Sequence, residues 1–287
     1  MRSIVALAVA LLLLNGGPVQ AKPPVWIVRD ADSELVLFGS IHVLPPNLDW
    51  RPAALDNALQ VADDLWLELP IDPQTEARSA QLAGAQGVMA ADKSLFALLS
   101  PKGRDRLQKA CLRFHLAPGL VDRLAPWYAE VVLASVEYQQ AGAAVGAGVE
   151  QSVAKLTPAG ARREALETPE FQIGLFAQAP VAEQVASLEE SLQEMETAPK
   201  AFNRLLAAWM AGDLGTLEKD ALGPLRKASP LLYARLVTER NAAWAAILDG
   251  RLKGHGHTVV VVGMGHLIGP GGVPARLRAL GYSVEGP

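Results

Sequence analysis

Two stretches near opposite ends of this chain share one pattern, in which a run of β-branched or apolar residues leads into Gly-x-x-His. The first is Val36-Leu37-Phe38-Gly39-Ser40-Ile41-His42, and the second is Val259-Val260-Val261-Val262-Gly263-Met264-Gly265-His266. A strand that ends in a glycine turn and then presents an imidazole places chemistry at the carboxyl edge of an open α/β sheet. The repeated pattern therefore predicts that His42 and His266 meet at one site.

The hydrophobic pattern predicts strands only toward the two ends of the chain. Apolar or alternating runs mark strands at residues 26–29, 35–38, 65–69, 259–262 and 282–284, with helices beginning near Pro52 and covering 273–280. Residues 75–248 are mostly helical in pattern and are interrupted by prolines. We expect an α+β fold whose split central sheet is built from both ends of the chain, with a large helical insertion between. No low-complexity linker divides residues 22–287, so we expect a single domain.

The first 21 residues are typical of a secretory signal peptide. Arg2 gives a positive start, residues 4–14 form an uninterrupted run of eleven apolar residues, and Val19-Gln20-Ala21 ends in a small residue suited to cleavage. The run is too short to span a bilayer, which takes about 20 apolar residues. We expect an exported protein, periplasmic or secreted, that is not an integral membrane protein after cleavage.

Processing is directly measurable. We expect the exported protein to begin at Lys22, because the apolar run is short and is followed by a small-residue cleavage site. Intact-mass measurement of periplasmic material checks this start. A mass that includes residues 1–21 would contradict it.

Charge and cysteine content argue against a nucleic-acid-binding protein and against a disulfide-rich extracellular module. The formal net charge is −4, which gives no electrostatic footprint for nucleic acid, and we expect no nucleic-acid partner. The single cysteine, Cys111, cannot form an internal disulfide. For an exported chain, this fits a bacterial envelope better than a disulfide-dense extracellular module.

Glu68 is the candidate third residue of the histidine site. It ends the predicted strand Leu65-Trp66-Leu67-Glu68-Leu69, where a charge among large apolar residues needs a reason. The alternative is an edge-strand glutamate that faces water. Two histidines and one carboxylate form a metal site open to manganese, cobalt, zinc or iron, with a position left for water. We therefore predict that His42, Glu68 and His266 are metal ligands.

The glycines of the second stretch also resemble a dinucleotide-binding fingerprint. Gly263, Gly265 and Gly269 follow a valine-rich strand, and Glu285 lies twenty residues past Gly265. The spacing is G-x-G-x-x-x-G, however, and the chain stops at Pro287 without the further strands that such a domain needs. We therefore favour the histidine site.

Two polar residues interrupt the apolar stripes of the helix that follows Pro230. Arg240 lies in the stripe of Leu236, and Asn241 lies in the adjacent stripe. Buried polar groups are costly without partners, so the arginine either pairs with a buried carboxylate or holds a carboxylate or oxyanion of a substrate. Glu150 and Glu167 are candidate partners or general bases. The remaining histidines are predicted to be structural (His115) or to lie in a solvated loop (His255 and His257).

Several motifs together resemble the TraB/GumN family, whose relatives include the Tiki-type metalloproteases. They are Gly39-Ser40-Ile41-His42, the strand ending in Glu68, Gly148-Val149-Glu150, Leu166-Glu167-Thr168, Glu239-Arg240-Asn241 with Trp244, Val262-Gly263-Met264-Gly265-His266-Leu267, and Leu277-Arg278-Ala279-Leu280-Gly281-Tyr282. The resemblance implies an α+β fold with a split sheet, a site with the two Gly-x-x-His histidines and a glutamate, and, for the Tiki branch, metal-dependent peptide-bond hydrolysis. More distant relatives bind haem or hydrolyse an ester.

The residues and the resemblance together predict a metal-dependent hydrolase of the bacterial envelope with a peptide or protein substrate. In this interpretation His42, Glu68 and His266 hold a divalent ion (manganese, cobalt or zinc), while Arg240 and Asn241, with Glu150 as a further candidate, act on the substrate. The alternative is a non-enzymatic periplasmic protein that uses the same histidines for haem or a metal. An absorbance scan for a haem Soret band discriminates between them.

Overall fold

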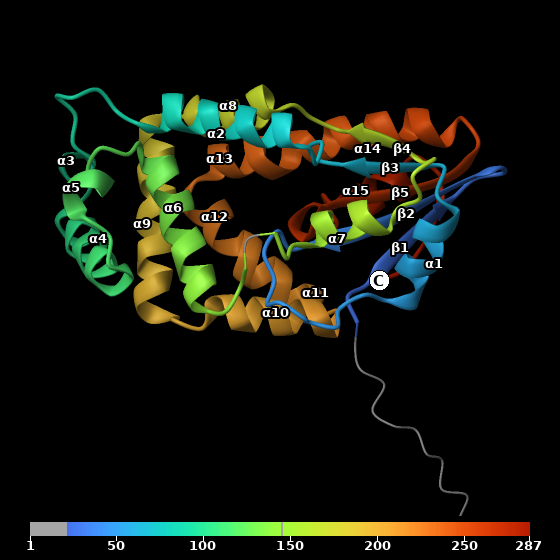
Figure 1. The fold of residues 1–287 in the computed structure, drawn as a ribbon, viewed down its shortest axis with the longest axis horizontal. Coiled ribbons are helices and arrows are strands. Elements are labelled where there is room, and N and C mark those ends of the chain that lie inside the picture. The colour runs from blue at the N-terminus through green and yellow to red at the C-terminus, as the bar shows by residue number, and fades with distance from the viewer. Residues whose placement is uncertain (1–21, 145) are drawn as a thin grey trace, which may run out of the picture.

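Six strands form one mixed sheet, which the chain builds from both of its ends. The computed structural model describes residues 22–144 and 146–287, so the predicted signal peptide lies outside the described residues. The strand order is β4-β3-β5-β2-β1-β6. The strands are β1 (Val25–Arg29), β2 (Ser33–Ser40), β3 (Asp64–Leu67), β4 (Arg162–Ala165), β5 (Gly256–Gly263) and β6 (Ser283–Glu285). In Figure 1 the blue N-terminal strands lie beside the red C-terminal ones, which confirms the expected α+β class.

The two strands that lead to the histidines are direct neighbours. β2 and β5 pair in parallel, with Gly39 opposite Val262 and Ser40 opposite Gly263. β3 pairs in parallel with the other side of β5 and ends opposite Val261. The carboxyl ends of β2, β3 and β5 therefore reach the same edge of the sheet. Residues 259–262 are fully buried, as expected for a central strand covered on both faces.

One strand, β4, was not predicted from the sequence. It consists of Arg162, Arg163, Glu164 and Ala165 at the edge of the sheet, and its first three residues are exposed. A charged edge strand has neither the apolar run nor the alternation that marks a strand in a sequence. β4 interrupts the long helical region and leads directly to Glu167.

Helices make up most of the chain between β3 and β5, and a few others lie before β3 and after β5. The helices are α1 (Ala53–Val61), α2 (Pro73–Gly87), α3 (Leu95–Leu98), α4 (Pro101–Phe114), α5 (Pro118–Val121), α6 (Pro126–Gln140), α7 (Val149–Leu156), α8 (Pro169–Ala177), α9 (Val181–Thr197), α10 (Ala201–Ala211), α11 (Leu214–Leu217), η1 (Glu218–Leu222), α12 (Gly223–Ala228), α13 (Pro230–Tyr233), η2 (Ala234–Thr238), α14 (Glu239–Leu252), η3 (Met264–His266) and α15 (Val273–Ala279). Among the described residues, none of these helices has the length and apolar character to cross a membrane.

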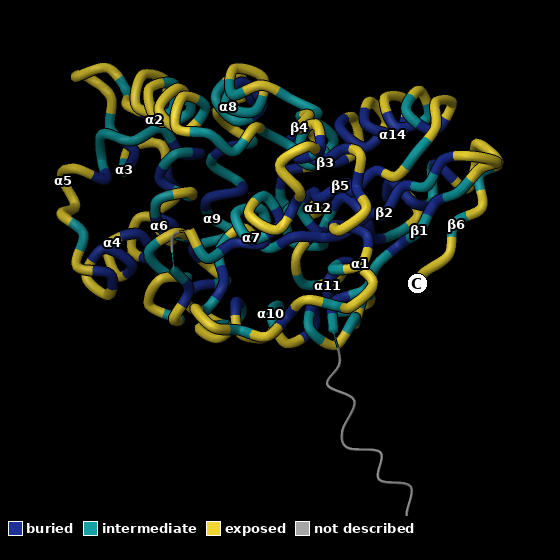
Figure 2. The backbone as a smooth tube through the Cα atoms, turned by 45° about the vertical axis from the view of Figure 1, so that its right-hand side comes forward, coloured by how far each residue is buried: buried dark blue, intermediate teal, exposed yellow. Residues whose placement is uncertain are grey.

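The buried side chains form two clusters. The larger one surrounds the sheet and includes Phe38, Trp50 and Trp209, whose rings lie 5.5–6.1 Å apart. The smaller one lies among helices α4, α6 and α9, away from the sheet. Figure 2 shows the contrast between the dark blue strands β2, β3 and β5 and the largely exposed outer helices. The expectation of a single domain stays a prediction.

The helix that carries Arg240 contains a wide turn. α13, η2 and α14 follow one another without a break, and η2 is a π-helical segment. Both Arg240 and Asn241 are buried, at 8% and 1% exposure, although they belong to adjacent stripes of a regular helix. π-helical turns are found frequently at functional sites, where they reorient side chains.

Candidate functional site

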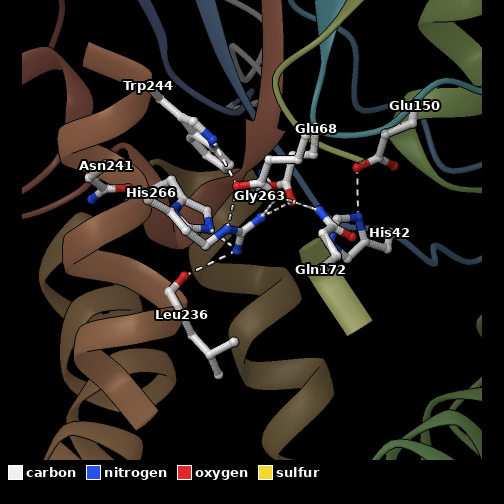
Figure 3. A network of polar contacts seen from close by, with 11 residues as sticks. His42, Glu68, Glu150, Gln172, Leu236, Asn241, Trp244, Gly263 and His266 are labelled. Carbon is white, nitrogen blue, oxygen red and sulfur yellow. Dashed lines mark hydrogen bonds and ion pairs between the residues drawn. The ribbon is translucent and has the colours of Figure 1, made fainter. Parts of the chain in front are cut away.

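The three residues predicted as metal ligands border one small space beside Gly263. A Cβ atom added to Gly263 would lie 3.2 Å from Glu68 Oε1, 3.6 Å from His266 Cδ2 and 3.9 Å from His42 Nε2. The backbone N–H of Gly263 also donates to Glu68 Oε1 at 2.7 Å. Figure 3 shows the side chains that surround this point. The shared edge of the sheet therefore brings together His42 and His266, which are more than 200 positions apart in the sequence, with Glu68 between them in the chain.

Each histidine is oriented through its Nδ1 atom. His42 Nδ1 lies 2.6 Å from Glu150 Oε1, and His266 Nδ1 lies 2.6 Å from Asn241 Oδ1. The orientation of the Asn241 amide follows from its Nδ2, which donates to the Gly271 carbonyl at 2.9 Å. His266 Nδ1 is therefore the donor to Asn241, and its Nε2 carries the lone pair. The Nε2 of His266 in turn accepts from Arg240 Nη1 at 3.0 Å.

The two histidines lie in opposite electrostatic environments. The carboxylate of Glu150 raises the pKa of His42 to about 9, while solvent at the 67% exposed ring screens this attraction and limits what the pair adds to stability. Burial lowers the pKa of His266 to about 4, and the Glu68 charge opposes the shift. His266 is therefore neutral at pH 7, whereas His42 favours its charged form.

Arg240 is the centre of a buried ion cluster. Its guanidinium holds Glu167 in a bidentate pair, with Nε to Oε1 and Nη2 to Oε2 both at 2.8 Å, and Nη2 also donates to Glu68 Oε2 at 2.6 Å. The Trp244 ring lies 4.6 Å from the guanidinium carbon, and its Nε1 donates to Glu167 Oε1 at 2.9 Å. Burial works to raise the pKa of Glu68, but Arg240 and the two histidines outweigh it and hold that pKa at about 2. Arg240 thus pairs with buried carboxylates and also contacts the histidine site.

Gln172 belongs to this cluster but was not among the predicted site residues. Its Nε2 donates to Glu68 Oε2 at 3.0 Å and to Glu167 Oε2 at 2.9 Å, so one amide bridges the two carboxylates. α8, which begins after the capping residue Thr168, places this side chain. The available signal was its position one turn into a helix that directly follows Glu167, but a single glutamine in a helix is common.

The other histidines lie outside this cluster. His115 ends α4 in the left-handed conformation, with φ of 56°, and its backbone N–H caps the helix. The prediction that His257 lies in a loop was wrong: it lies in β5, at the opposite end of the strand from Gly263, with Nδ1 3.7 Å from Glu34 Oε1. Neither position brings a side chain to the site.

In this structure the predicted ligand atoms of Glu68 and His266 contact a positively charged side chain, that of Arg240. Within residues 22–144 and 146–287, no three His, Cys, Asp or Glu side chains have the spacing to hold a metal ion together. Instead the guanidinium of Arg240 lies between Glu68 Oε2 and His266 Nε2. The assignment of His42, Glu68 and His266 as metal ligands therefore stays a prediction.

Two recesses lie on either side of the ion cluster. One, of about 270 Å³, is lined by His42, Glu68, Glu150 and Gln172 together with residues 69–71. The other, of about 650 Å³, is lined by Glu167 and Arg240 and by apolar residues of α8 and α14. The first recess opens onto His42 and Glu68 but is not lined by the buried His266.

Gly148 sets the approach of α7 to the loop that carries His42. A Cβ atom at position 148 would collide with the backbone carbonyl of His42. We expect Gly148→Ala to lower the free energy of unfolding by about 1–3 kcal/mol, since the backbone itself must move, and to disturb the His42–Glu150 pair. Urea unfolding measures the effect. Gly160→Ala is the matched control, because nothing lies within 4 Å of the added methyl group there. Equal stability of the two variants would contradict the expectation.

Comparisons with known proteins agree with the motifs. The chain is 25% identical over 257 residues to the uncharacterized protein YbaP of Escherichia coli strain K12, a match that covers 89% of this chain and 92% of the relative. YbaP of Shigella flexneri matches with the same identity and coverage. No solved structure gives a significant match. The pattern of one family covers residues 24–286, from before β1 to past β6, and thus includes both histidines and the whole ion cluster. The chain belongs to the TraB/PrgY/gumN family.

Proposed function

We propose that this protein is a metal-dependent hydrolase of the bacterial envelope that acts on peptides. The observation that carries the proposal is the convergence of His42 Nε2, Glu68 Oε1 and the His266 ring beside Gly263. These three side chains would hold a manganese, cobalt or zinc ion. Such an ion, when bound, lowers the pKa of its water and polarises a carbonyl group.

The chemistry of the surrounding residues fits a divalent ion. Ligand histidines in proteins commonly donate their second ring nitrogen to a carboxylate or amide oxygen, which fixes the ring and its tautomer. His42 with Glu150 and His266 with Asn241 both have this arrangement. The place between Glu68 and His266 already favours positive charge, because the guanidinium of Arg240 is bound there. Ion binding would therefore require Arg240 to give up its contact with His266.

The residues around the predicted ligands have separable roles in this proposal. Asn241 and Glu150 are positioning residues for the two histidines, and Glu150 also lines the open recess as a candidate general base. The pair with Glu167 holds Arg240 beside the site, where its charge can stabilise negative charge on a substrate carbonyl. Gln172 donates to both Glu68 and Glu167 and so fixes the two carboxylates relative to each other.

Removal and return of the metal tests the proposal. We expect dialysis of the protein against a chelator to abolish cleavage of a peptide library, and we expect one of manganese, cobalt or zinc to restore it. Elemental analysis before dialysis measures the bound metal. Cleavage that continues unchanged in metal-free protein would contradict the proposal. An absorbance scan of the same sample tests the haem alternative, since a Soret band would favour it.

A further inference from the structure

The larger recess beside the ion cluster has an apolar body. It lies between α8, the segment of residues 166–168 and the run formed by η2 and α14, and its volume is about 650 Å³. Its apolar wall consists of Leu166, Phe171, Leu175, Ala243, Trp244 and Ile247. Phe171 and Ile247 are partly open to solvent, at 49% and 38% exposure. An exposed phenylalanine and isoleucine on one recess are typical of a surface that takes up an apolar group.

One positive charge in this recess has no carboxylate partner. Arg240 is neutralised by Glu68 and Glu167, but Arg235, one turn earlier, forms no ion pair with any described residue. Its Nη2 donates only to the Gly174 carbonyl, at 3.3 Å, and its Nη1, unlike its buried Nε, is open to solvent and has no hydrogen-bond partner within the described part of the chain. A guanidinium with a free donor edge beside an apolar wall can bind the carboxylate of a ligand. The fourth charged residue of the recess, Glu239, is exposed.

The recess adjoins the predicted hydrolytic site. It shares Glu167 and Arg240 with the ion cluster, and the Gln172 amide links Glu167 to Glu68 on the side of His42. Arg240 therefore lines the larger recess and at the same time contacts Glu68 and His266 of the histidine site.

We propose that this recess binds the C-terminal residue of a peptide, with an apolar side chain against Phe171 and Ile247 and the carboxylate on Arg235. The inference rests on the proposed peptide hydrolysis and specifies its substrate as a peptide with a free, apolar C-terminus. A planar guanidinium matches a carboxylate in two parallel hydrogen bonds, which a C-terminal amide cannot reproduce. The recognition would thus depend on both the apolar wall and the charge.

Equilibrium binding of two probes to chelator-treated protein tests the proposal. The probes are acetyl-Gly-Gly-Leu with a free carboxylate and the same peptide as its C-terminal amide, and saturation-transfer NMR follows their titration. We expect the acid to bind at least about tenfold more tightly than the amide, in line with a charge-assisted bidentate pair. Arg235→Gln should remove this preference, and Glu239→Gln should keep it or increase it, because Glu239 is the competing negative charge.

Control variants separate the charge from the apolar wall and from folding. Arg104→Gln makes the same charge change on the exposed face of α4 and should leave both affinities unchanged. Ala243→Phe should weaken the binding of the acid and of the amide together, because the added ring fills the recess. This variant still tests whether the recess binds the peptide if Arg235→Gln fails to fold. Equal binding of acid and amide, or an unchanged preference in Arg235→Gln, would overturn the proposal. Octanoate binding more tightly than the peptide acid would overturn the assignment to a peptide.

The titrations use metal-free protein and need no turnover. Equal binding of the two probes therefore counts against the recess alone. A failure of metal-dependent cleavage counts against the proposed hydrolysis. The preference of the recess for the acid over the amide can still be measured in that case.

Discussion

Alanine at His42, Glu68 or His266 is expected to remove bound metal and peptide hydrolysis, with activity falling more than about 100-fold in each case. Losing even a residue that only orients a ligand costs 10- to 100-fold in affinity or activity, so losing a ligand should cost at least as much. The three side chains border one space at Gly263, so each would contribute a ligand atom to the same ion. Elemental analysis and a peptide-library assay on each variant measure the two effects.

The same variants must be shown to fold. We expect far-ultraviolet circular dichroism to stay unchanged for His42→Ala, since this ring is largely exposed. Glu68→Gln accompanies Glu68→Ala, because it keeps the shape of a side chain that contacts Arg240 and Gln172. His257→Ala is the matched control on the same strand as Gly263 but at its other end. Metal content that stays at the parent level in all three ligand variants would contradict the proposed site.

Arg240→Lys is expected to keep the fold and lose the activity. Lysine retains the charge but not the planar fork, so it cannot hold Glu167 in two bonds and contact Glu68 and His266 at once. Arg240→Ala should be far more damaging to stability, by about 3–5 kcal/mol, because it leaves Glu68 and Glu167 buried without a counter-charge. Thermal melts and hydrolysis assays on the same preparations separate the two roles of the arginine.

A second buried arginine provides the control for this experiment. Arg251 contacts Asp64 Oδ2 through Nε at 3.0 Å at the opposite end of β3, and its side chain is as buried as that of Arg240. Arg251→Lys should lower the melting temperature without changing metal content or cleavage. Full activity of a stable Arg240→Lys variant would remove Arg240 from the mechanism, whereas an unfolded one would show that its role is structural.

Local sequence patterns were enough to predict the strands and turns of this protein, because these depend on residues that are close together in the chain. The valine run of β5 and the apolar run of β2 are buried central strands, and such strands show as continuous apolar runs. Glu68 follows β3 as a charge after an apolar strand, and the pattern of strands at both ends predicted the split sheet. The Gly-x-x-His pattern led to the two histidines because a turn after a strand is a local feature. Together these motifs also identified the family.

The tertiary structure alone decided the partners of each functional side chain. Nothing local in the sequence pairs His42 with Glu150, 108 positions away, or Arg240 with both Glu68 and Glu167. The register of β2 against β5 sets which residues meet at the sheet edge. The position of Glu167 depends on β4, a strand of exposed charged residues that no sequence pattern predicts. Gln172 joins the cluster only because α8 packs beside that edge. Periodicity reports burial along one element, whereas a site made of contacts between elements depends on how the sheet is ordered.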